Sequence, residues 1–364
     1  MINLSEALEQ TATCKRHLLL GNGFSISLFP KCFSYASLFQ EAKEAGLFTA
    51  TPELAAAFEA LNTTDFEFVM ESLKAASLLG PLYGFDGQKL AAHAELLKQV
   101  LVEAIAGRHP SRPSEISEEQ YRSCRAFLAE FIGSQREDRF KGRIFSLNYD
   151  LLLYWSVLHD IHDASPGFLS ENIDQDLKND DGFRAPEDNF DAEYVAWDQF
   201  NASNSQSVTF LHGALHLYER GSELSKLCWE RSGNTPLMDQ IRGSLDQDRY
   251  PLFVSEGTSS FKMKKINRSA YLSKGLRSFA QCCNTKSASI FIIGHSLADN
   301  DAHVFKRISK GKVQKLYVSI FGDPLSQDNL AIRAKAERLS AQRPLSHPLD
   351  VNFIDAETLH IWNH

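Results

Sequence analysis

Leu18-Leu19-Leu20-Gly21-Asn22-Gly23-Phe24-Ser25 is the stretch that decides the fold, because a short apolar run enters a glycine turn and then a segment that can start a helix. In α/β proteins, glycines at such a turn let backbone amides and a helix N-terminus approach a pyrophosphate. The third glycine of the dinucleotide-binding pattern is absent, and a glycine turn after a strand is structural more often than not. The stretch therefore predicts a strand, a turn and a helix, and its function depends on the rest of the chain.

Other short runs follow, each mostly apolar on both faces as buried parallel strands are. They cover residues 143–147, 208–211, 252–254, 289–293, 316–321 and 351–354. Helical patterns lie between several of them, for example at 300–310 and 328–342. This alternation predicts an α/β fold with a Rossmann-like, doubly wound and mostly parallel sheet.

Residues 34–140 have a different pattern, which is almost entirely helical. Leu54, Phe58 and Leu61 recur at helical spacing, and Ser117 with Gln120 predicts a capping box at a helix start. We therefore expect a large helical insertion at 34–140 in a core formed by residues 1–33 and 141–364. Within that core, the acidic stretch 165–198 is expected to be a long loop.

Composition excludes several classes of protein. The 364 residues carry a formal net charge of -8 with no long basic tract, which argues against direct nucleic-acid binding. Residues 1–9 are mixed and polar, so we expect no signal peptide, and no apolar stretch approaches the length of a membrane span. The six cysteines form no C-x-x-C pair, so no zinc is expected. We expect a cytoplasmic protein with reduced thiols.

Polar residues follow three of the expected strands, where open α/β sheets place ligand contacts. Asn148 can hold a ribose hydroxyl or a water, and Asp150 can either cap the next helix or contact a ligand. His212, followed by Gly213, is either a general base or a structural histidine. The Gly294-His295-Ser296 turn suits close contact with a ribose or phosphate.

The last of these turns also has the spacing of a metal site. His295, Asp299 and His303 are four apart, which resembles metal-ligand spacing on one helix face. Three metal ligands on a single helix that begins directly after a glycine are an unfavourable arrangement for a metal site. Asp299 is better suited to cap the helix. We therefore expect no bound metal.

Taken in order, these segments resemble the SIR2-like (sirtuin-related) family over most of the chain. Gly21 and Gly23 match its glycine loop, with Asn22 in place of alanine, and Gly294 and Ser296 match its late Gly-Thr-Ser motif, with His295 in place of threonine. The Asn-x-Asp and His-Gly motifs also match, at Asn148 with Asp150 and at His212 with Gly213. The family's zinc module is absent, which argues against protein deacylation.

The resemblance is closer to the bacterial antiphage-defence branch of that family. That branch has Asn-Tyr-Asp, as at 148–150, and often Asp-Phe-Glu in the insertion, as at 65–67. The resemblance implies an NAD glycohydrolase that cleaves NAD to nicotinamide and ADP-ribose, with NAD as its substrate and with Asn148 and His212 as the catalytic residues. It implies that the NAD site is lined by Gly21, Asn22, Gly23, Phe24, Ser25, Asp150, Gly213, Gly294, His295 and Ser296.

Two alternatives remain open at this point: an NAD-dependent protein deacylase, and a non-catalytic sensor that binds NAD or ADP-ribose. Retention of both Asn148 and His212 favours catalysis, because a pure binder needs neither a base nor a water-orienting amide. No separate sensor domain is visible in the chain. We therefore expect a homo-oligomer, or activation by a separately encoded ATPase or a phage protein.

Overall fold

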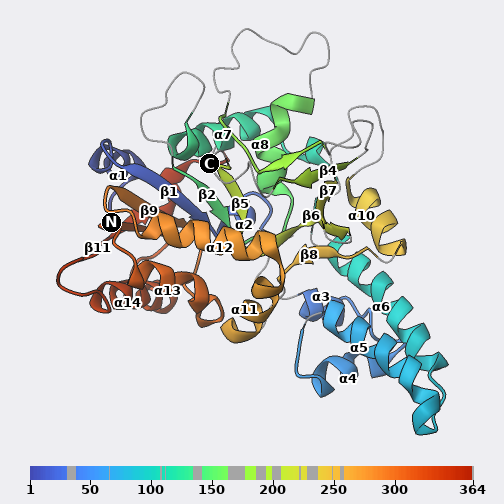
Figure 1. Cartoon of the computed structure of the whole chain (residues 1–364). Helices are drawn as coiled ribbons and strands as arrows, with labels where there is room; N and C mark the ends of the chain where they lie inside the picture. Colours follow the sequence, from blue (N-terminus) through green and yellow to red (C-terminus); the bar gives the residue numbers. More distant parts are fainter. Residues whose placement is uncertain are drawn as a thin grey trace.

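A six-stranded sheet forms the centre of the computed structural model (Figure 1). The structure describes residues 1–30, 38–64, 66–106, 109–110, 112–133, 142–162, 177–185, 194–198, 206–220, 223–227, 237–247, 249–254 and 258–362. In chain order, the strands of the central sheet are β1 (Lys15–Leu20), β2 (Ile144–Ser146), β5 (Val208–Phe210), β9 (Ala288–Ile293), β10 (Lys315–Ile320) and β11 (Asp350–Asp355).

The order of these strands is β11-β10-β9-β1-β2-β5, and all five neighbouring pairs are parallel. Numbered by their place in the chain, the strands run 3-2-1-4-5-6 across the sheet, which is the order of the Rossmann fold. The direction of winding reverses between β1 and β9, and ligands of open α/β sheets bind at the carboxyl ends of the strands beside such a point. The predicted fold class is confirmed.

Helices surround the sheet and also form a separate group. Those outside residues 34–140 are α1 (Leu4–Gln10), α2 (Gly23–Ile26), α8 (Leu152–His162), α10 (Leu237–Asp246), α11 (Ser259–Arg268), α12 (Ala270–Cys283), α13 (Ala302–Lys310) and α14 (Gln327–Ala341), with the 3-10 turns η3 (Asp299–Asp301) and η4 (Ala356–Leu359). Those inside are α3 (Leu38–Glu44), α4 (Pro52–Ala60), α5 (Phe66–Leu79), η1 (Gly80–Tyr83), α6 (Gln88–Ala106), η2 (Pro113–Glu115) and α7 (Glu118–Ile132). None of the helices in these described segments has both the length and the apolar character to span a membrane.

Both faces of the sheet are covered, as a doubly wound fold requires. Phe291 of β9 and Phe145 of β2 pair with the successive β1 residues Leu18 and Leu19, so they point to opposite faces. Phe131 of α7 packs on Phe291 with ring centroids 5.2 Å apart. On the other face, Phe279 of α12 packs on Phe145, with ring centroids 5.0 Å apart. Burial of β2, β5 and β9 on both sides, and of most of β1 and β10, explains the mostly apolar runs of the sequence.

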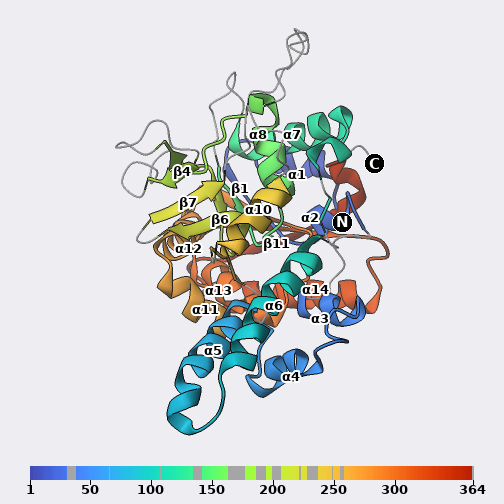
Figure 2. The same ribbon diagram turned by 90° about the vertical axis from the view of Figure 1, so that its right-hand side faces the viewer.

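The expected helical insertion has two parts in the structure. Helices α3 to α6 form an arm that projects away from the sheet (Figures 1 and 2), with Phe58 stacked on Phe39 and edge-on to Phe66. Helix α7 begins with the predicted capping box of Ser117 and Gln120, but it packs on the parallel sheet. Asp65 and the side chain of Glu67 lie outside what the structure describes.

A second sheet was not expected from the sequence. It is antiparallel, in the order β3-β4-β7-β6-β8. Its strands are β3 (Phe183–Arg184), β4 (Tyr194–Trp197), β6 (Gly213–Arg220), β7 (Glu223–Leu227) and β8 (Pro251–Phe253). The run at 252–254 therefore belongs to β8, which pairs antiparallel with β6, and is not a strand of the parallel sheet. The described parts of the acidic stretch 165–198 contain β3 and β4. These strands have two and four residues, which is too few to show the alternation of apolar and polar residues that marks a strand.

Candidate functional site

The turns after β1 and β9 meet backbone to backbone at the point where the winding reverses. The N–H of Gly23 donates to the Gly294 carbonyl at 2.8 Å, and the N–H of Gly21 donates to Ile293 at 2.9 Å. A Cβ on Gly23 would lie 2.6 Å from the Gly294 Cα, and Gly294 itself has φ +68°. These glycines are therefore required for the close packing of the two turns.

This packing changes the role that the sequence suggested for the glycine turn. Helix α2 is one turn long, and the N–H groups of Gly21, Gly23, Phe24 and Ser25 all donate to backbone carbonyls. They are already hydrogen-bonded and do not present a row of free amides to a pyrophosphate.

Replacing Gly23 with alanine is expected to lower the free energy of unfolding by about 1–3 kcal/mol, because the new Cβ overlaps the Gly294 backbone. Urea denaturation measures this loss. The matched control is Gly243→Ala in α10, where the added Cβ meets no atom within 4 Å and alanine favours the helix. If the two variants lost equal stability, the packing role of Gly23 would be wrong.

The turn after β9 presents polar groups that are available to a ligand. The N–H of Gly294 donates to the Ser319 hydroxyl, and the N–H of Leu297 donates to Nδ1 of His295. Within the described part of the chain, the N–H groups of His295 and Ser296 donate to no acceptor, and Ser296 is exposed. An anion at this turn would meet two backbone donors and a serine hydroxyl.

Asn148 and Asp150, which follow β2, bind to the glycine turn. The Asn148 side-chain amide donates to the Gly21 carbonyl at 3.0 Å and to the Ser25 hydroxyl at 3.1 Å. Ser25 in turn donates to Asp150 Oδ2 at 2.6 Å, while Asp150 Oδ1 accepts the N–H of Leu152 at the start of α8. Asp150 therefore has the first of the two roles considered for it, capping of α8, and it also binds the glycine turn through Ser25. Its contact with a ligand stays a prediction. No hydrogen bond from the described residues reaches the side-chain oxygen Oδ1 of Asn148.

Burial raises the pKa of Asp150 to about 6, although the hydrogen bonds from Ser25 and Leu152 favour the ionised form. Because the folded-state pKa lies above the ordinary value of 3.8, ionisation destabilises the fold, and the loss develops as pH rises from about 4 through 6. The full effect is about 3 kcal/mol. We expect the stability of wild type relative to Asp150→Asn to fall by about this amount between pH 4 and pH 7 in urea titrations. A pH-independent difference would contradict this assignment.

The structure also shows the positions of three other residues that were predicted to line the site. Phe24 is buried and packs on Trp362, with ring centroids 5.1 Å apart. Gly213 has φ +72°, and a Cβ there would lie 2.0 Å from the Leu252 carbonyl oxygen, so it allows β6 and β8 to pair. Asn22 is half-buried at the tip of the glycine turn.

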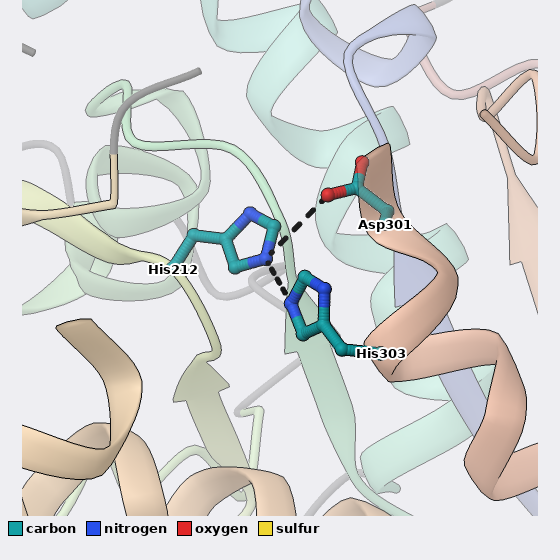
Figure 3. A group of neighbouring side chains, drawn as sticks. All are labelled: His212, Asp301 and His303. Atoms are coloured by element: carbon teal, nitrogen blue, oxygen red, sulfur yellow. Dashed lines mark hydrogen bonds and ion pairs between the residues drawn. The ribbon is translucent and has the colours of Figure 1, made fainter. Parts of the chain in front are cut away.

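His212 lies just beyond β5, in a group of polar side chains brought together from several elements (Figure 3). It is 3% exposed, and its Nε2 lies 3.1 Å from Nε2 of His303 and 3.8 Å from Oδ1 of Asp301. Asp301 also accepts from Lys262 at 2.7 Å and makes a 3.1 Å hydrogen bond with Nε2 of His295. A series of side-chain contacts thus connects the β9 turn to His212, through His295 and Asp301.

The charges in this group have defined states at neutral pH. Burial lowers the pKa of His212 to about 3, so the imidazole is neutral. Burial acts to raise the pKa of Asp301, but the hydrogen bond from His295 and the nearby positive charge of Lys262 outweigh it and hold that pKa far below its usual range. Asp301 and Lys262 therefore form a buried ion pair.

His212, Asp301 and His303 offer donor atoms within 4.8 Å of one another, a grouping found by searching only the described residues. It differs from the set of His295, Asp299 and His303 that the sequence spacing suggested. The Lys262 ammonium already neutralises the Asp301 carboxylate, and this ammonium would repel a divalent cation. The hydrogen bonds and the ion pair account for the geometry of the group without a metal.

The match to a family model covers nearly all of this architecture, from residue 18 in β1 to residue 362 after η4. The chain belongs to the DUF4917 family. The model's description is a domain of unknown function. No curated protein matches the chain.

Most predicted site residues of this DUF4917 chain come together at the carboxyl ends of β1, β2, β5 and β9. Asp299 is not the helix cap that we expected, because α13 begins after Asp301 and the Asp301 side chain binds Lys262. Three side chains of the group were not predicted: Asp301, its partner Lys262, and Ser259, whose hydroxyl oxygen lies 3.1 Å from Nδ1 of His303. Lys262 lies among other lysines of α11, a pattern that looks like a solvated helix face, and only the fold shows that it is buried.

Proposed function

We propose that this DUF4917 protein hydrolyses NAD to nicotinamide and ADP-ribose. The observation that carries the proposal is the convergence of Asn148, His212 and the Gly294 turn on one edge of a Rossmann-ordered sheet, beside the reversal of winding. Dinucleotides bind at this place in such sheets. The resemblance of the motifs to SIR2-like proteins supports NAD as the dinucleotide.

In this proposal, the β9 turn binds the diphosphate through the N–H groups of His295 and Ser296 and the Ser296 hydroxyl. The glycine turn after β1 leaves room for the ligand and holds the β9 turn in place. The nicotinamide ribose lies over the ends of β2 and β5, between Asn148 and His212. The Phe24 side chain is buried in the core and supports the glycine turn from that side.

The reaction would break the bond between the anomeric carbon and the nicotinamide nitrogen. A water oxygen bonds to that carbon through an oxocarbenium-like transition state, and the bonding electrons leave with neutral nicotinamide. The side-chain oxygen Oδ1 of Asn148, which accepts no hydrogen bond from the described residues, would orient the water or a ribose hydroxyl. The neutral His212 would accept the proton that the water releases, and Asp301 would stabilise the resulting imidazolium.

The test is to incubate the purified full chain with NAD and to follow nicotinamide by chromatography, with and without an acetylated peptide. Release with NAD alone is the expected result. The assay is repeated at high protein concentration and with a candidate ATPase or phage protein added, because these conditions can activate the enzyme. Release only with the peptide would identify a deacylase, and NAD binding without release under every one of these conditions would identify a sensor. Either outcome would overturn the hydrolase proposal.

Control of such an activity is also part of the proposal. A hydrolase that consumes NAD must be held inactive in a healthy cell, and we expect assembly into a homo-oligomer, or a separately encoded ATPase or phage protein, to activate it. A role in antiviral defence is what the resemblance implies, and it remains a prediction.

A further inference from the structure

We propose that His303 is a positioning residue, which holds His212 in the tautomer that carries its proton on Nε2 and leaves Nδ1 free to act as the base. The proposal rests on the proposed function for its catalytic consequence. The tautomer itself follows from contacts among buried side chains and can be measured without any substrate.

The position of Asp301 sets the direction of the hydrogen bond between the two imidazoles. Both rings meet through Nε2, 3.1 Å apart, so one nitrogen donates and the other accepts. Asp301 Oδ1 lies 3.8 Å from Nε2 of His212, and this carboxylate favours a proton on that nitrogen. His212 is therefore the donor and His303 is the acceptor.

Ser259 completes the arrangement at the far side of His303. With Nε2 accepting, the neutral His303 ring carries its proton on Nδ1, and Nδ1 lies 3.1 Å from the Ser259 hydroxyl oxygen. That oxygen also accepts the backbone N–H of His303 at 2.9 Å, and its two lone pairs fit both donors. Ser259 opens α11 and His303 lies in the first turn of α13, so two packed helices fix the ring.

The consequence is that the lone pair of His212 Nδ1 is available. Nδ1 makes no hydrogen bond with any residue that the structure describes. His303 thus takes the place that an aspartate holds beside the histidine of a hydrolase triad, where the partner fixes tautomer and orientation.

The experiment is long-range 1H–15N NMR of the imidazole nitrogens in the full chain at neutral pH. We expect an unprotonated Nδ1 and a protonated Nε2 for His212 in wild type. His303→Ala is expected to give a mixture of both tautomers, while His303→Gln, whose side-chain oxygen can accept from Nε2, restores the wild-type pattern. Ser259→Ala, with a smaller change at the ring, is a second variant in case His303→Ala fails to fold. The control is His347→Ala, in the turn before β11.

Kinetics separate this inference from the proposed function. If wild type releases nicotinamide, His303→Ala should lower kcat about 100-fold with little change in KM, and His303→Gln should recover most of the loss. A protonated Nδ1 in wild type, an unchanged tautomer in His303→Ala, or a stoichiometric metal ion bound by the purified protein would each overturn the inference. The predicted tautomer in a protein that leaves NAD intact would uphold the positioning role and reject the hydrolase.

Discussion

His212→Ala and Asn148→Ala are each expected to lower the rate of nicotinamide release at saturating NAD by at least about 100-fold. His212 is the only neutral base in the proposed site whose free nitrogen has no partner among the described residues. Asn148, which follows the neighbouring strand β2, has a side-chain oxygen Oδ1 that accepts no hydrogen bond from the described residues. Its side-chain nitrogen is held by hydrogen bonds to the Gly21 carbonyl and the Ser25 hydroxyl. Initial rates measured by chromatography give the ratio to wild type.

Matched controls make this result specific. His347→Ala and Asn352→Ala remove the same side chains from the turn before β11 and from β11 itself, and they should keep wild-type rates. His212→Ala should also bind NAD with an affinity close to that of wild type, because the diphosphate contacts are assigned to the β9 turn. A His212→Ala variant that cleaves NAD at the wild-type rate would remove His212 from the mechanism.

Lys262→Met is expected to lower the free energy of unfolding by about 3–5 kcal/mol, because it leaves the Asp301 carboxylate buried without its cation. Urea denaturation at neutral pH measures the loss. Lys264→Met on the exposed side of the same helix is the control and should be nearly neutral.

The double variant Lys262→Met with Asp301→Asn should recover part of that stability, since the unpaired charge is removed with its partner. Equal losses in the single and double variants would show that the methylene chain of Lys262, and not its charge, supports the fold.

The parallel sheet could be predicted from the sequence because β2, β5 and β9, and most residues of β1 and β10, are buried on both faces. Runs such as Leu18-Leu19-Leu20 and 290–293 are apolar at every position and end in a glycine, which marks both the strand and its carboxyl end. Since those ends lie at one edge of a parallel sheet, the turns at Gly21, Asn148, His212 and Gly294 could be placed together from the sequence alone.

The antiparallel sheet and the centre of the polar group could not be predicted in this way. The strands β3 and β4 are short and lie among acidic residues, so they show no periodicity. Lys262 and Ser259 come from α11, well before the Gly294 turn in the chain, and only the packing of α11 against α13 brings them to Asp301 and His303. Such contacts depend on tertiary structure, which local spacing does not encode.

The most direct test of the hydrolase proposal is to incubate the protein with NAD in water enriched in 18O and to analyse the products by mass spectrometry. We predict equal amounts of nicotinamide and ADP-ribose, with one 18O atom at the anomeric carbon of the ADP-ribose and no such product from His212→Ala. Recovery of intact NAD under every activating condition, or ADP-ribose transferred to another acceptor without 18O, would contradict the proposal.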